Sequence, residues 1–208
     1  MSIKKNLLNL KSKLPDNISL VAVSKTKPIS DLEQAYLTGQ RIFGENKVQE
    51  MVEKHEIMPK DIKWHMIGHL QKNKVKYIVP FIHLIHSVDS LELIRKINSV
   101  SEKNNVKTKC LVQIKIAEED SKFGMSPEDF EEIKKHLPNY QSINVIGLMG
   151  MATANVKKNQ TKKEFDFLHE IFKKSNNLNT LCMGMSQDYK IANECGSNMF
   201  RIGSFIFN

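Results

Sequence analysis

The chain has 208 residues, a length that suits one α/β domain. Its hydrophobic content is 40% and no run approaches the roughly 18 apolar residues of a membrane helix, so no membrane span is expected. The formal net charge of +8 would suit nucleic acid, but the lysines are scattered and no recognition helix or RNA-stacking motif is found, so we expect no nucleic-acid partner.

The N-terminus has the pattern of an amphipathic helix. Ile3, Leu7, Leu10 and Leu14 recur at helical spacing with lysines between them, and Pro15 ends the pattern. A signal peptide would instead have a continuous apolar region and a cleavage site. The three cysteines are odd in number and lack C-x-x-C spacing, which indicates neither a disulfide framework nor a zinc site. We therefore expect a cytoplasmic protein.

Apolar, strand-like runs alternate with helical periodicity along the whole chain. The predicted strands are ISLVAVS (18–24), QRIFGEN (40–46), IKWHMIG (62–68), FIHLIHS (81–87), KCLVQIKI (109–116), INVIGLMGM (143–151), TLCMGMS (180–186) and SNMFRIGSFIF (197–207). Helix starts are indicated by capping-box spacing at Ser30 with Glu33, Asp89 with Glu92 and Thr161 with Glu164, and by Ser126 before Pro127.

Strands that are apolar on both faces and separated by amphipathic helices indicate a parallel sheet covered by helices. Eight such repeats favour closure into a single-domain (β/α)8 TIM barrel over residues 1–208, with an extra N-terminal helix. An open Rossmann sheet is less consistent with the sequence, because the first strand runs into SKTKP where a glycine-rich turn would be needed.

The first predicted strand ends in a pair of lysines, Lys25 and Lys27. At the mouth of an apolar pocket, a lysine loses hydration, its pKa falls and its amine can attack a carbonyl. In the alternative interpretation, both ammonium groups reach into water at a strand end.

The last two predicted strands end in small, donor-rich turns. The seventh ends in Gly184, Met185 and Ser186, and the eighth carries Arg201, Gly203 and Ser204. A phosphate often lies beside strands seven and eight of such a barrel. Lys25 and these turns could therefore hold the two ends of a phosphorylated aldehyde, and pyridoxal 5'-phosphate (PLP) is such a molecule. Arg201 could face the PLP ring nitrogen, bind the phosphate or form a structural ion pair.

The motifs resemble those of the pyridoxal phosphate homeostasis proteins, the YggS or PROSC family, which are related to the barrel domain of alanine racemase. The matching segments are AVSKTKP (22–28), FGENKVQE (43–50), WHMIGHLQKNK (64–74), HSVD (86–89), SKFG (121–124), GLM (147–149), MGMSQDY (183–189) and MFRIGS (199–204). Departures at Lys47 and Lys115, and a missing proline in GLMGMATANV, affect the rim of the barrel and not the lysine or the phosphate turns.

The resemblance implies a PLP fold type III barrel in which Lys25 carries the cofactor as an internal aldimine. It also implies the other cofactor-binding residues, which are Asn46 beside the cofactor, Arg201 at the pyridine nitrogen, and Ser186, Gly203 and Ser204 at the phosphate. Lys27 and Lys122 match further lysines near the family's site, without an assigned role. His65 and His69 are four residues apart, but on a strand they would not share a face, so no metal site is expected.

The expected function is to hold PLP and deliver it to other enzymes, without catalytic turnover. We expect a monomer that binds PLP and makes transient contact with PLP-dependent apoenzymes. One alternative is a PLP-dependent racemase, although alanine racemases have a second β domain for which 208 residues leave no room. A second is a PLP-independent enzyme for a phosphorylated sugar, with Lys25 as a Schiff-base lysine, and a third is a nucleic-acid-binding protein.

Overall fold

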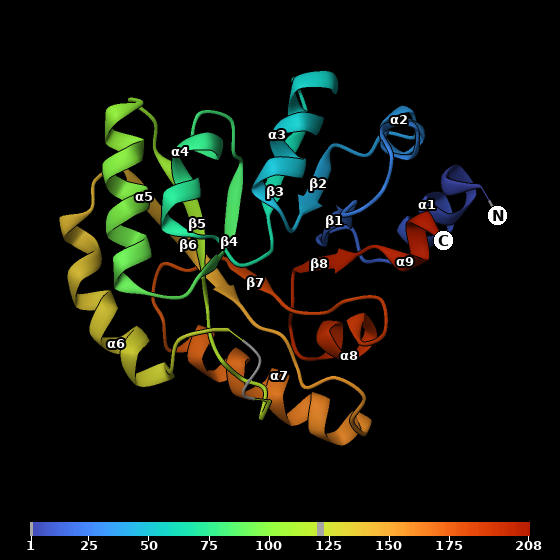
Figure 1. Cartoon of the computed structure of the whole chain (residues 1–208). Helices are drawn as coiled ribbons and strands as arrows, with labels where there is room; N and C mark the ends of the chain where they lie inside the picture. Colours follow the sequence, from blue (N-terminus) through green and yellow to red (C-terminus); the bar gives the residue numbers. More distant parts are fainter. Residues whose placement is uncertain (1, 120–122) are drawn as a thin grey trace.

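The computed structural model describes residues 2–119 and 123–208. Within them, eight parallel strands form a closed barrel in chain order, and β8 pairs with β1 to complete it (Figure 1). The strands are β1 (Ser19–Val23), β2 (Ile42–Glu45), β3 (Lys63–Met66), β4 (Leu84–Val88), β5 (Thr108–Gln113), β6 (Ile143–Met149), β7 (Thr180–Cys182) and β8 (Met199–Ile202). The predicted (β/α)8 barrel is confirmed, with strands shorter than the apolar runs suggested.

Helices cover the outside of the barrel (Figure 1). They are α1 (Ile3–Lys11), α2 (Ile29–Leu37), α3 (Val48–Ile57), α4 (Val75–Ile78), α5 (Leu91–Lys103), α6 (Pro127–His136), α7 (Lys158–Lys173), α8 (Tyr189–Glu194) and α9 (Ser204–Phe207), with 3-10 turns η1 (Lys72–Lys74) and η2 (Leu137–Asn139). Across the part of the chain that the structure describes, no helix is long and apolar enough to cross a bilayer.

The extra N-terminal helix predicted from the sequence is present as α1. It buries Ile3, Leu7 and Leu10. In Figure 1 it lies beside α9, so that the two ends of the chain are close together. The Asn6 side-chain amide fixes this arrangement, because it donates to the backbone oxygens of Ile206 at 3.2 Å and Asn208 at 3.1 Å.

The core has two parts, because successive residues of a barrel strand point alternately inward and outward. The side chains clustered in the barrel interior are Val21, Leu84, Leu111, Met149, Cys182 and Met199. A larger cluster lies between the strands and the helices and includes Leu20 and Ala22 of β1. On β1, odd-numbered residues therefore face the interior and even-numbered residues face the helices.

One of the predicted helix starts is confirmed and one is displaced by a residue. Ser126 caps α6, and its hydroxyl oxygen accepts a hydrogen bond from the Asp129 backbone nitrogen at 3.0 Å. The cap of α5 is Ser90 and not Asp89, because the Ser90 oxygen accepts from the Leu93 backbone nitrogen at 3.3 Å.

The other two predicted helix starts are wrong. Helix α2 begins directly after Pro28, without a side-chain cap, so Ser30 lies inside it. Thr161 lies within α7. Glu164 does not complete a capping box there, because its carboxylate accepts hydrogen bonds from the backbone nitrogen and the hydroxyl of Thr153, both at 2.7 Å.

Candidate functional site

The structure brings the predicted site residues to one edge of four neighbouring strands. In the barrel, β7 pairs with β8, β8 with β1, and β1 with β2. At or beyond the carboxyl ends of these strands lie Ser186 after β7, Arg201, Gly203 and Ser204 on or after β8, Lys25 after β1 and Asn46 after β2. The carboxyl edge is where barrels of this type hold ligands.

Lys25 lies in the turn that follows β1. Because Val21 faces the interior and alternate residues share a face, Lys25 is at the next inward position after Val23. Ser24 faces the other way, and its buried hydroxyl donates to Glu45 Oε1 at 2.6 Å. The Lys25 side chain is exposed, which agrees with the alternative interpretation in which the ammonium group at this strand end reaches into water.

The second lysine of the turn has a different position. The Lys27 ammonium donates to the side-chain oxygen of Asn208 at 2.8 Å and to the backbone oxygen of Phe207 at 3.4 Å. Lys27 therefore joins the turn after β1 to the end of α9. The other lysine left without a role by the sequence, Lys122, lies outside the described residues.

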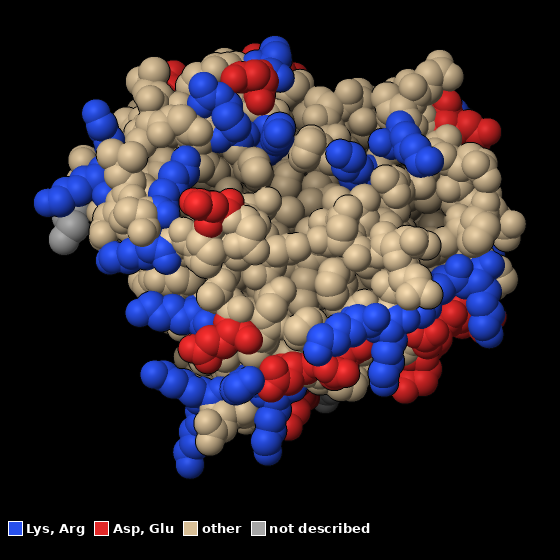
Figure 2. Space-filling model, turned by 180° about the vertical axis from the view of Figure 1, so that it is seen from behind, with Lys and Arg blue, Asp and Glu red and all other residues tan. Residues whose placement is uncertain are grey.

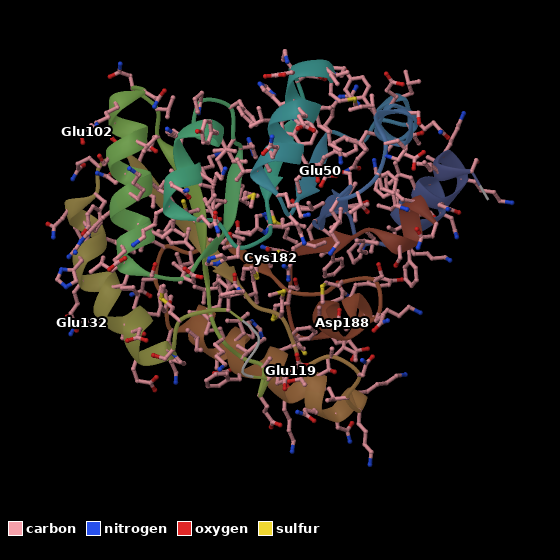
Figure 3. The ribbon with its side chains drawn as sticks, viewed as in Figure 1. Glu50, Glu102, Glu119, Glu132, Cys182 and Asp188 are labelled. Carbon is pink, nitrogen blue, oxygen red and sulfur yellow. The ribbon has the colours of Figure 1, made fainter. Side chains whose placement is uncertain are left out.

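The turn after β7 is stabilised by the side chain of Asp188, which lies at its end. Gly184 has a φ of 93°, in the left-handed region that favours glycine. The Asp188 carboxylate accepts a hydrogen bond from the Met185 backbone nitrogen at 2.6 Å, and burial raises the pKa of Asp188. Figure 3 shows Asp188 beside α8. Ser186, between these residues, is half-buried and can donate to a ligand.

The turn after β8 passes close to β1. A Cβ on Gly203 would lie 3.0 Å from the backbone oxygen of Val23, so glycine permits this approach. Ser204 is exposed and begins α9. Helices α8 and α9 have only six and four residues, so the donors that these turns can offer are first-turn N–H groups and serine hydroxyls more than helix dipoles.

Arg201 lies under these turns with 4% of its surface exposed. Its Nη2 donates to the backbone oxygen of Gly150 at 3.1 Å, and its backbone nitrogen donates to the oxygen of Gly184 at 3.0 Å. Its Nε is buried and has no hydrogen-bond partner among the described residues. A buried donor without a partner is costly, so a ligand that supplies an acceptor beside Arg201 would be favoured.

The barrel interior contains a chain of polar side chains that sequence reasoning did not find. His65 Nδ1 lies 2.9 Å from His86 Nε2, and His86 Nδ1 lies 3.5 Å from Cys182 Sγ. Figure 3 shows Cys182 at the centre of the barrel. The alternation of residues along β3 and β4 could have placed both histidines inward, but it could not have shown that they meet.

The exposed histidine of the same segment does not join this chain. His69 Nδ1 lies 3.3 Å from Asp89, and the His69 ring stacks on Phe123. His65 and His69 thus have separate surroundings, as predicted. In the described part of the chain, no group of three or more histidine, cysteine or acidic residues is arranged to hold a metal ion.

The sequence matches the family model of the alanine racemase N-terminal domain over residues 1–208. It is 35% identical to the pyridoxal phosphate homeostasis protein of Haemophilus influenzae over 201 residues, which cover 92% of this chain and 85% of that protein. It is 37% identical to the protein of the same name from Helicobacter pylori, with coverage of 91% and 87%. The chain belongs to the family of the pyridoxal phosphate homeostasis proteins.

Solved structures agree with the family assignment. PipY of Synechococcus elongatus PCC7942, solved with PLP bound, has a TM-score of 0.92 and 31% sequence identity, over 99% of this chain and 100% of that chain. Alanine racemase of Clostridium difficile 630 has a TM-score of 0.84 at 19% identity, over 99% of this chain but 56% of the racemase. The racemase comparison supports the shared fold of the barrel.

Proposed function

We propose that this protein binds PLP, with Lys25 as the attachment residue, and takes part in PLP homeostasis. The observation that carries the proposal is the position of Lys25 beside the two donor-rich turns, on adjacent strands of the closed barrel. A molecule with an aldehyde at one end and a phosphate at the other fits this pair of features. The family relationship and the PLP-bound PipY structure support the same ligand.

Each candidate residue has a role that its surroundings allow. The exposed amine of Lys25 can condense with an aldehyde and release one water. Ser186, Gly203 and Ser204 offer hydroxyl and backbone donors to a phosphate. The orphaned donor of Arg201 fits the acceptor nitrogen of the PLP ring, and an arginine there favours the unprotonated ring. Asn46, half-buried after β2, would contact the cofactor from the opposite side.

PLP supplies an aldehyde that exchanges reversibly between amines, and this chemistry suits a carrier. We propose delivery of PLP to apoenzymes through transient contact, without turnover by this chain. We also propose that the protein is a monomer in the cytoplasm, where its three free, buried cysteines would stay reduced. Measurable racemisation of alanine by the PLP-loaded protein would contradict the absence of turnover.

The attachment is tested by adding PLP to wild-type protein, Lys25→Ala and Lys27→Ala, and recording absorption before and after borohydride. Wild type and Lys27→Ala should show a band near the visible edge that borohydride removes, with the pyridoxyl mass fixed on Lys25. Lys25→Ala should show neither. Lys27 is the matched control because it is two residues away and its ammonium is bonded to Asn208. A protein that remains without a band would contradict PLP binding and leave the phosphosugar alternative.

A further inference from the structure

A second lysine, Lys54 of α3, lies behind the turn that carries Lys25. Only 5% of its surface is exposed. Its Nζ donates to the backbone oxygen of Ser24 at 2.8 Å, to Glu45 Oε1 at 2.8 Å and to Glu50 Oε1 at 2.7 Å. An ammonium group has three N–H donors, so these contacts occupy all of them. Lys54 is therefore fixed in position and poorly placed to react with an aldehyde.

The partners of Lys54 hold the residues on both sides of Lys25. Before it, the Ser24 oxygen accepts from Lys54, and the Ser24 hydroxyl donates to Glu45 at 2.6 Å. After it, the Thr26 backbone nitrogen donates to Glu50 Oε1 at 2.6 Å. One ammonium and two carboxylates thus clamp the backbone immediately around Lys25, while the Lys25 side chain stays exposed.

The turn needs such a clamp because its backbone is strained. Thr26 has a φ of 62°, which is unfavourable for a β-branched residue. Conformations of this kind persist only where surrounding contacts enforce them, and they are concentrated at functional sites. The bond from Thr26 to Glu50 is one such contact, and Lys54 fixes the orientation of Glu50.

A contribution to folding stability does not explain the group formed by Lys54, Glu45 and Glu50 well. Glu45 is fully buried, its Oε2 has no hydrogen-bond partner among the described residues, and burial raises its pKa despite the hydrogen bonds from Lys54 and Ser24. Buried ion pairs recover their desolvation cost incompletely, and apolar residues of similar volume are often as stabilising. A group retained at such a position is better explained by the geometry that it imposes.

We propose that Lys54 is a positioning residue that holds the Lys25 turn, through Ser24, Glu45 and Glu50, in the conformation that accepts PLP. The inference rests on the proposed function of Lys25 and adds a residue that does not touch the cofactor. Without Lys54, the Ser24 oxygen and Glu45 lose a charged donor, Thr26 can leave its strained conformation, and Lys25 is presented in several orientations. Loading should then be slower and weaker, although the attachment residue is intact.

The test compares PLP loading by wild type, Lys54→Met and Lys60→Met. Methionine keeps an unbranched chain and removes the ammonium. Lys60 is the matched control because it is exposed, follows the same helix and donates to the backbone oxygens of His55 and Glu56. The readouts are the dissociation constant, the loading rate and the residue that carries the borohydride-fixed mass, at a temperature where circular dichroism shows each apo protein to be folded.

Lys54→Met should bind PLP about tenfold more weakly or more slowly, which corresponds to the loss of one charged hydrogen bond. Lys60→Met should match wild type, and the fixed mass should stay on Lys25 in all three. Lys54→Arg, which keeps the charge, should restore part of the loading. Folded Lys54→Met that loads like wild type, even with a lowered melting temperature, would overturn the inference and leave Lys54 a purely structural role.

If Lys54→Met does not fold, a second variant tests whether the contacts of Lys54 position the Lys25 turn. Glu50→Ala removes the acceptor of the Thr26 backbone nitrogen at a partly exposed position, and it should show the same loading defect. Normal loading by Glu50→Ala would then overturn the inference. If the proposed function is wrong, wild type itself will carry no borohydride-fixed mass on Lys25. That result would contradict both the proposed function and the role of Lys54.

Discussion

At the scale of single residues, the contact between His65 and His86 requires at least one neutral ring. One nitrogen must donate and the other must accept across the 2.9 Å that separates them. Burial lowers the pKa of both histidines well below the usual value; His83 and Lys63 lower the pKa of His65 further, and a charge on His65 lowers that of His86. Arg201 adds a further positive charge near His86. The barrel interior is therefore built for two uncharged imidazoles.

This pair predicts a loss of stability in acid. In the unfolded chain the histidines bind protons as the pH falls through about 6.5, whereas in the folded chain they do not. Stability is therefore present above that pH and falls below it, by up to about 1.4 kcal/mol per pH unit for each histidine. Urea unfolding of wild type at pH 7.5 and pH 5.5 should show this decrease.

The matched variants separate the buried pair from other titrating groups. His65→Leu with His86→Leu should reduce the pH dependence of the unfolding free energy. His136→Gln is the control for the loss of a histidine on the outer helix α6, near Glu132, because it leaves both buried imidazoles in place, so the double variant should show the larger reduction. An undiminished pH dependence in the double variant would show that the buried histidines do not cause it.

Some candidate residues could be identified from the sequence and others could not. The lysines after β1 and the glycine and serine turns after β7 and β8 are local patterns, so the positions of Lys25 and Ser204 at one edge of the barrel could be predicted, while their roles stay predictions. Lys54 was not identified, because Glu50 and Lys54 have the spacing of an ordinary surface pair on a helix. Only the closed barrel shows that the Ser24 oxygen lies within reach of that lysine.

At the scale of elements, α1 shows how a helix outside the eight repeats contributes to the fold. Leu7 is fully buried, whereas Leu8, the next residue, is 49% exposed. Asn6 on the same helix bonds to the end of α9. The helix therefore packs with its apolar face against the core, and its Asn6 side chain holds α9, the segment that follows the turn after β8.

We predict that Leu7→Ala lowers the free energy of unfolding by about 2–5 kcal/mol, because it leaves a cavity in the core. Leu8→Ala is the matched control on the same helix and should change it by about 0.5 kcal/mol or less. Urea titrations followed by circular dichroism measure both. Equal effects of the two substitutions would contradict the packing of α1.

The order of the elements was predictable, whereas their ends were less so. Alternating apolar runs and amphipathic stretches fixed the number of strands, since both periodicities persist along the chain. Helix starts depended on one hydrogen bond each. Ser90 and Asp89 both have suitable oxygens, but the Leu93 backbone nitrogen donates to Ser90. Pro28 precedes α2 in an extended conformation and provides no side-chain cap, so the α2 start has no capping signal in the sequence.

At the scale of the whole molecule, the excess positive charge is mixed with negative charge. On the face shown in Figure 2, basic and acidic side chains are interleaved along the lower edge. Two exposed pairs on α7 are Lys162 with Asp166 and Lys173 with Glu170. This distribution favours the solvated surface that the scattered lysines suggested, and the absence of a nucleic-acid partner stays a prediction.

The closed barrel predicts a single cooperative unfolding transition, because no strand can leave without breaking its neighbours' ladders. Fluorescence of Trp64, the single tryptophan and fully buried on β3, should change together with far-ultraviolet circular dichroism. Urea titrations monitored by both signals measure the two midpoints. Midpoints that differ beyond error would contradict the expectation of one domain.

The pairing of β1 with β8 also determines when the ligand site can form during synthesis. Ser19 to Ala22 find their partners in Met199 to Ile202, about 180 residues later in the chain. The seam between these strands is also where Lys25 lies beside Gly203 and Ser204. A nascent chain on the ribosome thus lacks the site that we propose for PLP until β8 has emerged from the exit tunnel, so we expect PLP to be captured only by finished barrels.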